Sequence, residues 1–124
     1  MKPQYVTSKD LSKRLWEAGF RGESENWWWD GTGLGYELIQ YDSLEPCDRK
    51  ERDLHGFPAY HSGELLNALP TGLGGDGCLR IMTGGLGWTV YYADCQNPII
   101  VDKSDVTLVN AAAQMMLWCI KKGL

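Results

Sequence analysis

Residues 27–35 read Trp-Trp-Trp-Asp-Gly-Thr-Gly-Leu-Gly, so three consecutive tryptophans lead into a glycine-rich run. In an extended segment successive side chains point to opposite faces, so Trp27 and Trp29 would share one face and Trp28 would take the other. A tryptophan covers roughly 150–250 Å². The Trp27/Trp29 pair is therefore about as large as the biggest apolar patch on a typical soluble monomer. Such a strand is either covered by helices on both faces or docks something else on one of them.

The length and composition are those of one ordinary globular domain, residues 1–124. Of these residues 44% are hydrophobic and 23% are charged, which is enough to bury a core without disulfides or metals. The net charge of −4 argues against binding to the phosphates of nucleic acid. No apolar run approaches the ~18 residues that cross a bilayer, and the first residues lack a signal-peptide core. We expect a cytoplasmic protein that is not bound to membranes.

Three segments carry helical signals. Thr7 is placed to cap a helix over residues 8–18, whose apolar side chains recur at i, i+4 and i+7. Residues 107–122 form a second long helix, with two lysines in its last turn and a glycine after it. Residues 62–69 form a short helix that a proline closes.

Four segments have the pattern of strands, residues 26–30, 34–41, 78–82 and 88–92, and glycine-rich turns join them in pairs. Residues 42–58 are expected to be a loop. We predict an α+β fold in which a small antiparallel sheet of three to four strands packs against the N- and C-terminal helices, with one short helix in addition. The expected core consists of Leu11, Leu15, Ile81, Val90, Ala112, Met116 and Ile120.

No known catalytic or metal-binding signature is present in the residue pattern. His55 and His61 have no metal-ligand spacing, so surface or capping roles are favoured. The glycine-rich turns lack the spacing of dinucleotide- or phosphate-binding loops. We therefore expect neither a metal nor another cofactor. Four scattered cysteines are expected to be free thiols: Cys47, Cys78, Cys95 and Cys119.

Three carboxylates lie in the aromatic region of the chain: Asp30, Glu37 and Asp42. If two of them converged, they would be able to act as general acid and base. The other reading, which we favour, makes them polar rims of a half-exposed sheet.

Six tryptophans and six tyrosines against two phenylalanines favour aromatic side chains with a polar tip, which are enriched at interfaces. Such rings also stack on single-stranded nucleic acid, but the hairpin strands carry only one cation, Arg80. We expect a binding surface for a protein partner, or for a second copy of the chain across a two-fold axis. Core and interface both remain open for the tryptophans. The expected surface residues are Trp27, Trp28, Trp29, Tyr36 and Tyr41.

The order of motifs resembles a family of short, uncharacterised phage and prophage proteins. Residues 5–15 (Tyr-Val-Thr-Ser-Lys-Asp-Leu-Ser-Lys-Arg-Leu) resemble its opening, and a Trp-bearing strand follows at a similar distance. Residues 58–70 resemble its middle, an aromatic lead-in to a short Glu-Leu helix closed by Leu-Pro. Residues 88–92 and 111–120 resemble its last strand and its Ala-rich helix.

The resemblance covers most of the chain except about residues 42–57 and 94–104. His61 stands where the family usually has a capping hydroxyl, so we expect the cap of the short helix at Ser62. The tryptophan and glycine run also departs from the family pattern. The resemblance implies a phage origin and an α+β fold, and it transfers no active site.

Two functions follow from the sequence. The first, which we favour, is a non-enzymatic phage accessory protein that binds a host protein or complex of unknown identity, for instance to inhibit a defence system such as CRISPR. The alternative is a small nucleotide-binding protein or hydrolase that uses the glycine-rich turns and the carboxylates near the tryptophans.

The absence of a ligand pattern predicts that the fold does not depend on a metal ion. Treatment with EDTA should leave the Tm and the circular dichroism spectrum unchanged, because a structural metal would contribute directly to folding. Thermal unfolding before and after the treatment measures this, and a fall in Tm would contradict the prediction.

Overall fold

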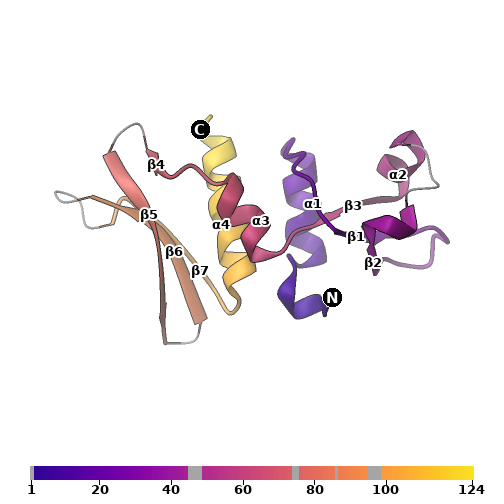
Figure 1. Cartoon of the computed structure of the whole chain (residues 1–124), viewed down its shortest axis with the longest axis horizontal. Coiled ribbons are helices and arrows are strands. Elements are labelled where there is room, and N and C mark those ends of the chain that lie inside the picture. The colour runs from indigo at the N-terminus through magenta and orange to yellow at the C-terminus, as the bar shows by residue number, and fades with distance from the viewer. Residues whose placement is uncertain (1, 45–48, 74–75, 86, 95–98) are drawn as a thin grey trace.

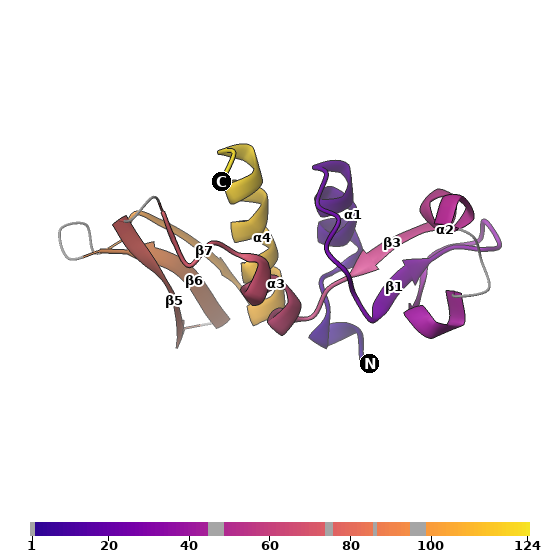
Figure 2. The same cartoon turned by 45° about the horizontal axis from the view of Figure 1, so that its top comes forward.

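A computed structural model describes residues 2–44, 49–73, 76–85, 87–94 and 99–124. The molecule is elongated, and its sheets and helices lie beside one another along the long axis in an order that differs from their order in the chain (Figures 1 and 2). Their bounds are η1 Pro3–Tyr5, α1 Lys9–Glu17, β1 Asn26–Trp29, β2 Glu37–Gln40, η2 Tyr41–Leu44, α2 Arg49–His55, β3 Gly56–Ala59, α3 Ser62–Ala68, β4 Gly72–Leu73, β5 Asp76–Gly84, β6 Gly87–Ala93, β7 Val101–Asp105 and α4 Leu108–Lys121.

The α+β class is confirmed, but the expected strands belong to two separate antiparallel sheets. Strands β2-β1-β3 form one sheet, here called the tryptophan sheet, and β4-β5-β6-β7 form the other, here called the C-terminal sheet. Helices α3 and α4 and then α1 lie between them (Figure 1). The expectation of one continuous sheet is therefore wrong. Each sheet packs on helices of its own side: α4 on β6 and β7, and α1 on β3.

Residues 42–58, expected to be a loop, contain the end of η2 as well as α2 and β3. All four residues of β3 are buried, so the strand has no alternation of apolar and polar residues by which to recognise it. Trp27 and Trp28 of β1 pair with Pro58 and Phe57. Because β3 is an edge strand, it tolerates a proline, which has no N–H to donate.

Helix α1 begins one residue later than expected, because Ser8 rather than Thr7 is its N-cap. The Ser8 hydroxyl accepts a hydrogen bond from Leu11 N (3.2 Å). Thr7 is fully buried instead. Its hydroxyl accepts from Tyr60 N (3.0 Å) and lies 2.5 Å from the Ser12 hydroxyl. Positions 7 and 12 correspond to N′ and N4, where many helices have a pair of apolar side chains, so here a hydrogen-bonded pair takes that role.

The Thr7 backbone extends this junction to the tryptophan sheet. The Thr7 carbonyl accepts from Trp28 Nε1 (3.0 Å) and from the Ser12 hydroxyl (3.2 Å). Thr7 N donates to Tyr60 O (2.7 Å). The start of α1, strand β1 and the chain after β3 thus meet at one buried residue.

The main core lies between α1, α3, α4 and the C-terminal sheet. Of the expected core, Leu11, Leu15, Val90, Ala112 and Met116 are buried, and the half-buried Ile120 packs against them. Ile81 does not belong to the core, because its side chain is 41% exposed. Its pairing partner Val90 is covered, but α4 packs over β6 and β7 rather than over β5.

The substitution Thr7→Val should lower the free energy of unfolding by about 1–3 kcal/mol, because it leaves the buried Tyr60 N–H without an acceptor. Urea unfolding measures the difference. Thr83→Val is a matched control, because Thr83 is exposed on β5 and its loss should change stability little. Equal stability of Thr7→Val and the wild type would contradict a structural role for this hydroxyl.

Candidate functional site

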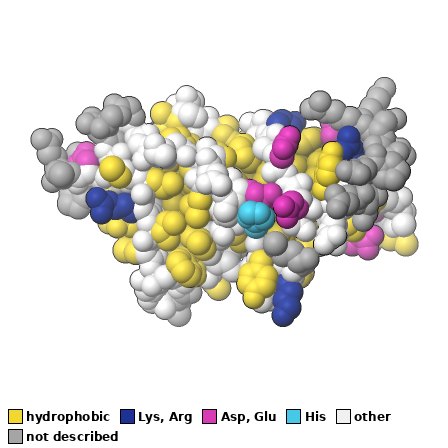
Figure 3. Space-filling view, viewed as in Figure 1, with side chains coloured by type: hydrophobic (Ala, Val, Ile, Leu, Met, Phe, Trp, Pro, Cys, Tyr) yellow, Lys and Arg dark blue, Asp and Glu magenta, His cyan; other side chains and the backbone are white. Residues whose placement is uncertain are grey.

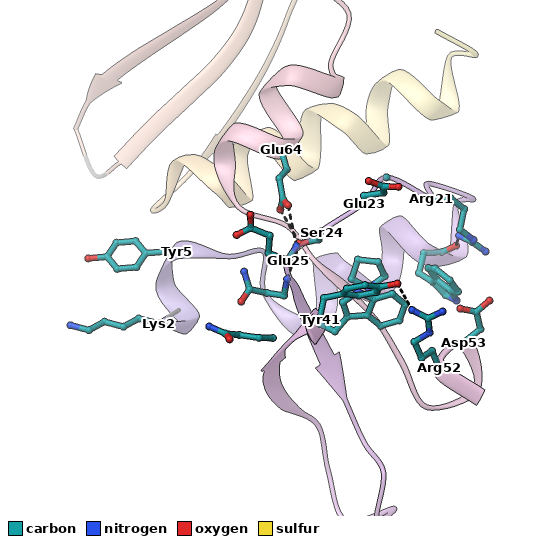
Figure 4. Close-up of a pocket in the computed structure, with 16 residues that line it drawn as sticks. Lys2, Tyr5, Arg21, Glu23, Ser24, Glu25, Tyr41, Arg52, Asp53 and Glu64 are labelled. Atoms are coloured by element: carbon teal, nitrogen blue, oxygen red, sulfur yellow. Dashed lines mark hydrogen bonds between the residues drawn. The ribbon is translucent and has the colours of Figure 1, made fainter. Parts of the chain in front are cut away.

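An open groove of about 1360 Å³ lies where the tryptophan sheet meets the end of α1 and the start of α3 (Figure 4). Its lining mixes aromatic side chains with charges of both signs. Tyr5 of η1 lies at its rim, and three further aromatic residues come from three other elements: Trp16 from α1, Trp27 from β1 and Tyr41 from η2. Trp16, Trp27 and Tyr41 are here called the aromatic row.

Ring contacts hold the aromatic row together. The Trp27 ring meets the Trp16 ring edge to face, with 6.2 Å between centroids, and lies 6.3 Å from the Tyr41 ring. Pairs in this range of distance and tilt are favourable beyond the area that they bury. Trp27, only 8% exposed, is the fixed centre of the row.

Two arginines stack on the outer members of the row. The Arg21 guanidinium lies 3.6 Å from the centre of the Trp16 ring, and its Nη1 donates to Trp16 O (2.6 Å). The Arg52 guanidinium lies 5.2 Å from the Tyr41 ring and also donates to the Tyr41 hydroxyl. Stacking on an aromatic face fixes the plane of a guanidinium and leaves its other N–H groups available.

Neither arginine has a carboxylate partner in the part of the chain that the structure describes, where the ion pairs are Lys13–Glu17 and His61–Glu64. Arg52 Nε is buried, and it has no hydrogen-bond partner among the described residues. Arg21 and Arg52 lie toward the same end of the groove as Asp53 (Figure 4).

Glu25 and Glu64 lie toward the other part of the groove, whereas Glu23 and Asp53 lie beside the two arginines (Figure 4). The carboxylate of Glu64 is fully engaged by its neighbours. Its Oε1 accepts from the Ser24 hydroxyl (2.9 Å) and from His61 N (2.9 Å), and its Oε2 accepts from Glu25 N (3.3 Å). Figure 3 shows acidic side chains gathered beside a histidine in the middle of the molecule. Glu64 thus orders the wall of the groove instead of offering a free base.

His61 is the N-cap of α3, so the expectation that the cap falls on Ser62 is wrong. His61 Nδ1 accepts a hydrogen bond from Glu64 N (3.3 Å), and the Glu64 carboxylate accepts one from His61 N. The two hydrogen bonds together form a capping box. An imidazole nitrogen can replace a hydroxyl as an acceptor. The capping role proposed for the histidines is thereby confirmed for His61.

Of the five expected surface residues, the structure brings only Trp27 and Tyr41 together in the groove. Trp28 is half-buried, and its indole Nε1 donates a hydrogen bond to the Thr7 carbonyl. Trp29 meets the His55 ring of α2 at 5.6 Å. Tyr36 is 39% exposed and lies against another part of the tryptophan sheet, where it packs on a phenylalanine of β3.

The expected carboxylates do not form a pair in the groove. Asp30 accepts from Gly33 N (2.7 Å), which makes it a turn residue between β1 and β2. Glu37 is exposed at the start of β2. Asp42 is outside the side chains that the structure describes. Neither Asp30 nor Glu37 lines the groove.

The groove residues that sequence reasoning missed are Trp16, Arg21 and Arg52. Trp16 had a detectable signal, because it lies outside the apolar stripe of an amphipathic helix and is still a large aromatic residue. The two arginines had no such signal in the sequence, because the rings that they contact, Trp16 and Tyr41, are brought to them only by the fold.

The cysteines and other titratable groups do not add a second site. Among the described residues no group of three or more His, Cys, Asp or Glu side chains is arranged to hold a metal ion. Cys78 and Cys119 are free thiols, and burial raises the pKa of Cys119, as expected for a small core residue. Burial also raises the pKa of Tyr92, whose hydroxyl donates to Pro70 O (2.6 Å). Cys47 and Cys95 lie outside the described residues.

Comparisons with known proteins identify no relative: no protein-family model, no curated protein and no solved structure matches this chain. Within the described residues, no helix is both long and apolar enough to span a bilayer. The function must therefore be inferred from the groove itself.

His61→Ala should lower the free energy of unfolding by about 1 kcal/mol, whereas His61→Asn should preserve it, because asparagine is a favoured N-cap and alanine is not. Thermal or urea unfolding of the two variants distinguishes the cap from a merely exposed histidine. If alanine were tolerated as well as asparagine, the capping contact would have no energetic weight.

Proposed function

We propose that this chain is a small non-enzymatic accessory protein of a phage and that it acts by binding a host protein or complex, such as a component of a CRISPR defence system. The observation that carries the binding role is the groove, in which tryptophan, tyrosine and arginine side chains share one open surface. These three residue types dominate the binding energy of protein interfaces.

The fixed geometry of the groove favours binding. Trp27 is held by two rings, and both guanidiniums are stacked before a partner arrives. Ordering side chains in advance lowers the entropy lost on association. A rigid aromatic row flanked by charges is therefore well suited to a partner with a complementary surface.

The alternative, a small nucleotide-binding protein or hydrolase, has less support. Glu64 accepts three hydrogen bonds in the wall of the groove, and Asp30 serves a turn. Gly33 and Gly35 have positive φ angles in the link between β1 and β2, where glycine adopts a conformation that other residues avoid. The backbone conformation therefore explains why glycine stands at these two positions, without a role in binding phosphate.

The phage origin and the host partner rest on the resemblance of the motif order to phage and prophage proteins. A small binding module without a catalytic site is the kind of protein that would block a host complex by occupying its surface. The resemblance is the reason for seeking the partner in a bacterial cell.

Site-specific photocrosslinking in a lysate of the bacterial host tests the proposal. Tyr5, exposed at the rim of the groove, is replaced by p-benzoylphenylalanine, and the adducts are identified by mass spectrometry. We expect one host protein to be captured from this position. Ser104, exposed on β7 of the C-terminal sheet, is the control position and should not capture it. The same adducts from both positions, or none from Tyr5, would contradict the proposal.

A second copy of the chain remains the other partner that we propose for the aromatic surface. Sedimentation velocity over a wide range of concentrations measures it directly. A sedimentation coefficient that rises with concentration, and that no longer does so in Tyr36→Ala or Tyr41→Ala, would support a homodimer. A constant monomer value would exclude it over that range.

A further inference from the structure

Strand β5 has an edge that stays open over much of its length. The neighbouring strand β4 is short and pairs only with the first part of β5, where Leu79 N also donates to Thr71 O (3.0 Å). β4 therefore lies beside one end of β5 (Figure 1). Beyond Leu79, no strand among the described residues pairs with this side of β5, whereas its other side pairs with β6 as far as Gly84.

The direction of the free backbone groups follows from antiparallel geometry. Leu79 directs its N–H toward the β4 side, and backbone groups alternate between the two sides of a strand. Ile81 and Thr83 therefore also direct their N–H and C=O groups away from β6. The hairpin agrees with this assignment, because Gly84 pairs with Gly87 of β6 at the turn. Ile81 and Thr83 thus offer a row of backbone donors and acceptors to another strand.

The side chains of this edge do not protect it against pairing. Natural proteins commonly guard an open edge with charged residues or prolines. The opposite edge of the same sheet, β7, reads Val-Asp-Lys-Ser-Asp and is guarded in this way. The open part of β5 has instead the exposed residues Ile81, Met82 and Thr83. Such an apolar edge is prone to aggregation unless a strand covers it.

We propose that a second copy of the chain covers this edge, so that two β5 strands pair antiparallel across a two-fold axis and join the two C-terminal sheets. Met82 faces its counterpart at the axis, and Ile81 of each copy exchanges hydrogen bonds with Thr83 of the other. The contact lies at the end of the molecule away from the tryptophan sheet (Figure 1). The inference goes beyond the proposed function and does not depend on it.

The sequence of β5 favours this register. Ile81 and Thr83 are the residues whose backbone groups are free, and pairing each with the other satisfies both copies equally. A shift toward Leu79 is blocked, because the chain of β4 already lies there. In the centred register Arg80 lies opposite Gly84, so the two arginines do not oppose each other and each has room for its long side chain.

Pairing in this register also covers apolar side chains on the inner face of the sheet. Directly opposite residues share a face, so Ile81 lies beside Val90 and Thr83 lies beside Trp88. Helix α4 packs over β6 and β7, and Val90 is buried while Ile81 and Trp88 stay exposed. In the dimer, one row of contacts runs from Val90 of one copy to Trp88 of the other. A closed pair of this kind uses both edges and leaves none for a third copy.

Cysteine crosslinking tests the register. Cys47, Cys78 and Cys95 are first replaced by serine. In this background Met82→Cys should give a disulfide-linked dimer on mild oxidation, because opposed residues of a non-hydrogen-bonded pair have Cα atoms roughly 4.5 Å apart, a distance that a disulfide spans. Arg80→Cys, exposed on the same face of the same strand, is the matched control. It lies opposite a glycine in this register and should not crosslink.

Sedimentation velocity tests the hydrogen bonds of the edge. We expect the wild type to be a dimer at micromolar concentrations and Thr83→Pro to raise the Kd of the dimer about tenfold or more, because proline has no N–H to donate. An edge strand tolerates proline where the N–H points away from the sheet. Thr83→Val keeps the N–H and should remain dimeric. The cysteine variants keep the test decisive if Thr83→Pro does not fold.

A monomer at every concentration, a dimer that Thr83→Pro does not weaken, or equal crosslinking of the two cysteine variants would overturn the proposal. A dimer that Tyr36→Ala or Tyr41→Ala dissociates would place the contact on the aromatic surface and overturn it as well. Oxidation of the Met82→Cys variant in the host lysate adds a third outcome. A disulfide to a host protein in place of the dimer would assign the edge to a strand of that protein. Crosslinking from Tyr5 decides the role of the groove independently.

Discussion

Thr7 is fully buried, and every polar atom of its hydroxyl and backbone makes a hydrogen bond within the protein. A buried hydroxyl or amide without a hydrogen bond is unfavourable, so these groups can be buried only if their partners are correctly placed. Their partners are Ser12, Trp28 and Tyr60. The junction therefore sets where α1 begins, where β1 lies and how the chain leaves β3. A chain that placed one of these elements differently would leave buried polar atoms unsatisfied.

The groove follows from the same constraint. Trp28 is held by the Thr7 carbonyl, and the preceding residue in the strand, Trp27, meets the last turn of α1 at Trp16. Ser8 N donates to Asn110 Oδ1 (3.0 Å), which ties the start of α1 to the first turn of α4. The aromatic row is thus fixed relative to both the tryptophan sheet and the main core. Its three rings come from separate elements, and the position of each depends on the tertiary fold.

The sequence is informative where the relevant signal is local. The end of α4 follows from its last lysines and the terminal glycine, whereas its start was placed one residue early, at Thr107, which is the N-cap. The strand pair β5 and β6 follows from alternation on both sides of a glycine turn. Local signals are weaker for β3, which is buried on both faces, and for β7, a polar edge strand. Both need a partner strand before their conformation is favoured. The cap of α1 was misplaced by one residue because Thr7 and Ser8 are equally good caps, and only burial of Thr7 distinguishes them.

The same reasoning explains which groove residues were predictable. Trp27 and Tyr41 belong to an aromatic cluster that is visible in the sequence, whereas Arg21 and Arg52 lie in segments with no pattern at all. Arg52 differs from other polar residues in how well its hydrogen-bonding groups are satisfied. The hydrogen-bonding groups of Thr7, Ser12 and Glu64 have partners, but among the described residues Arg52 Nε has none. Departures from internal satisfaction concentrate at functional and strained sites, where the local rules that the rest of the fold obeys are broken. Arg52 is such a departure, in a groove whose wall at Glu64 is held by three hydrogen bonds.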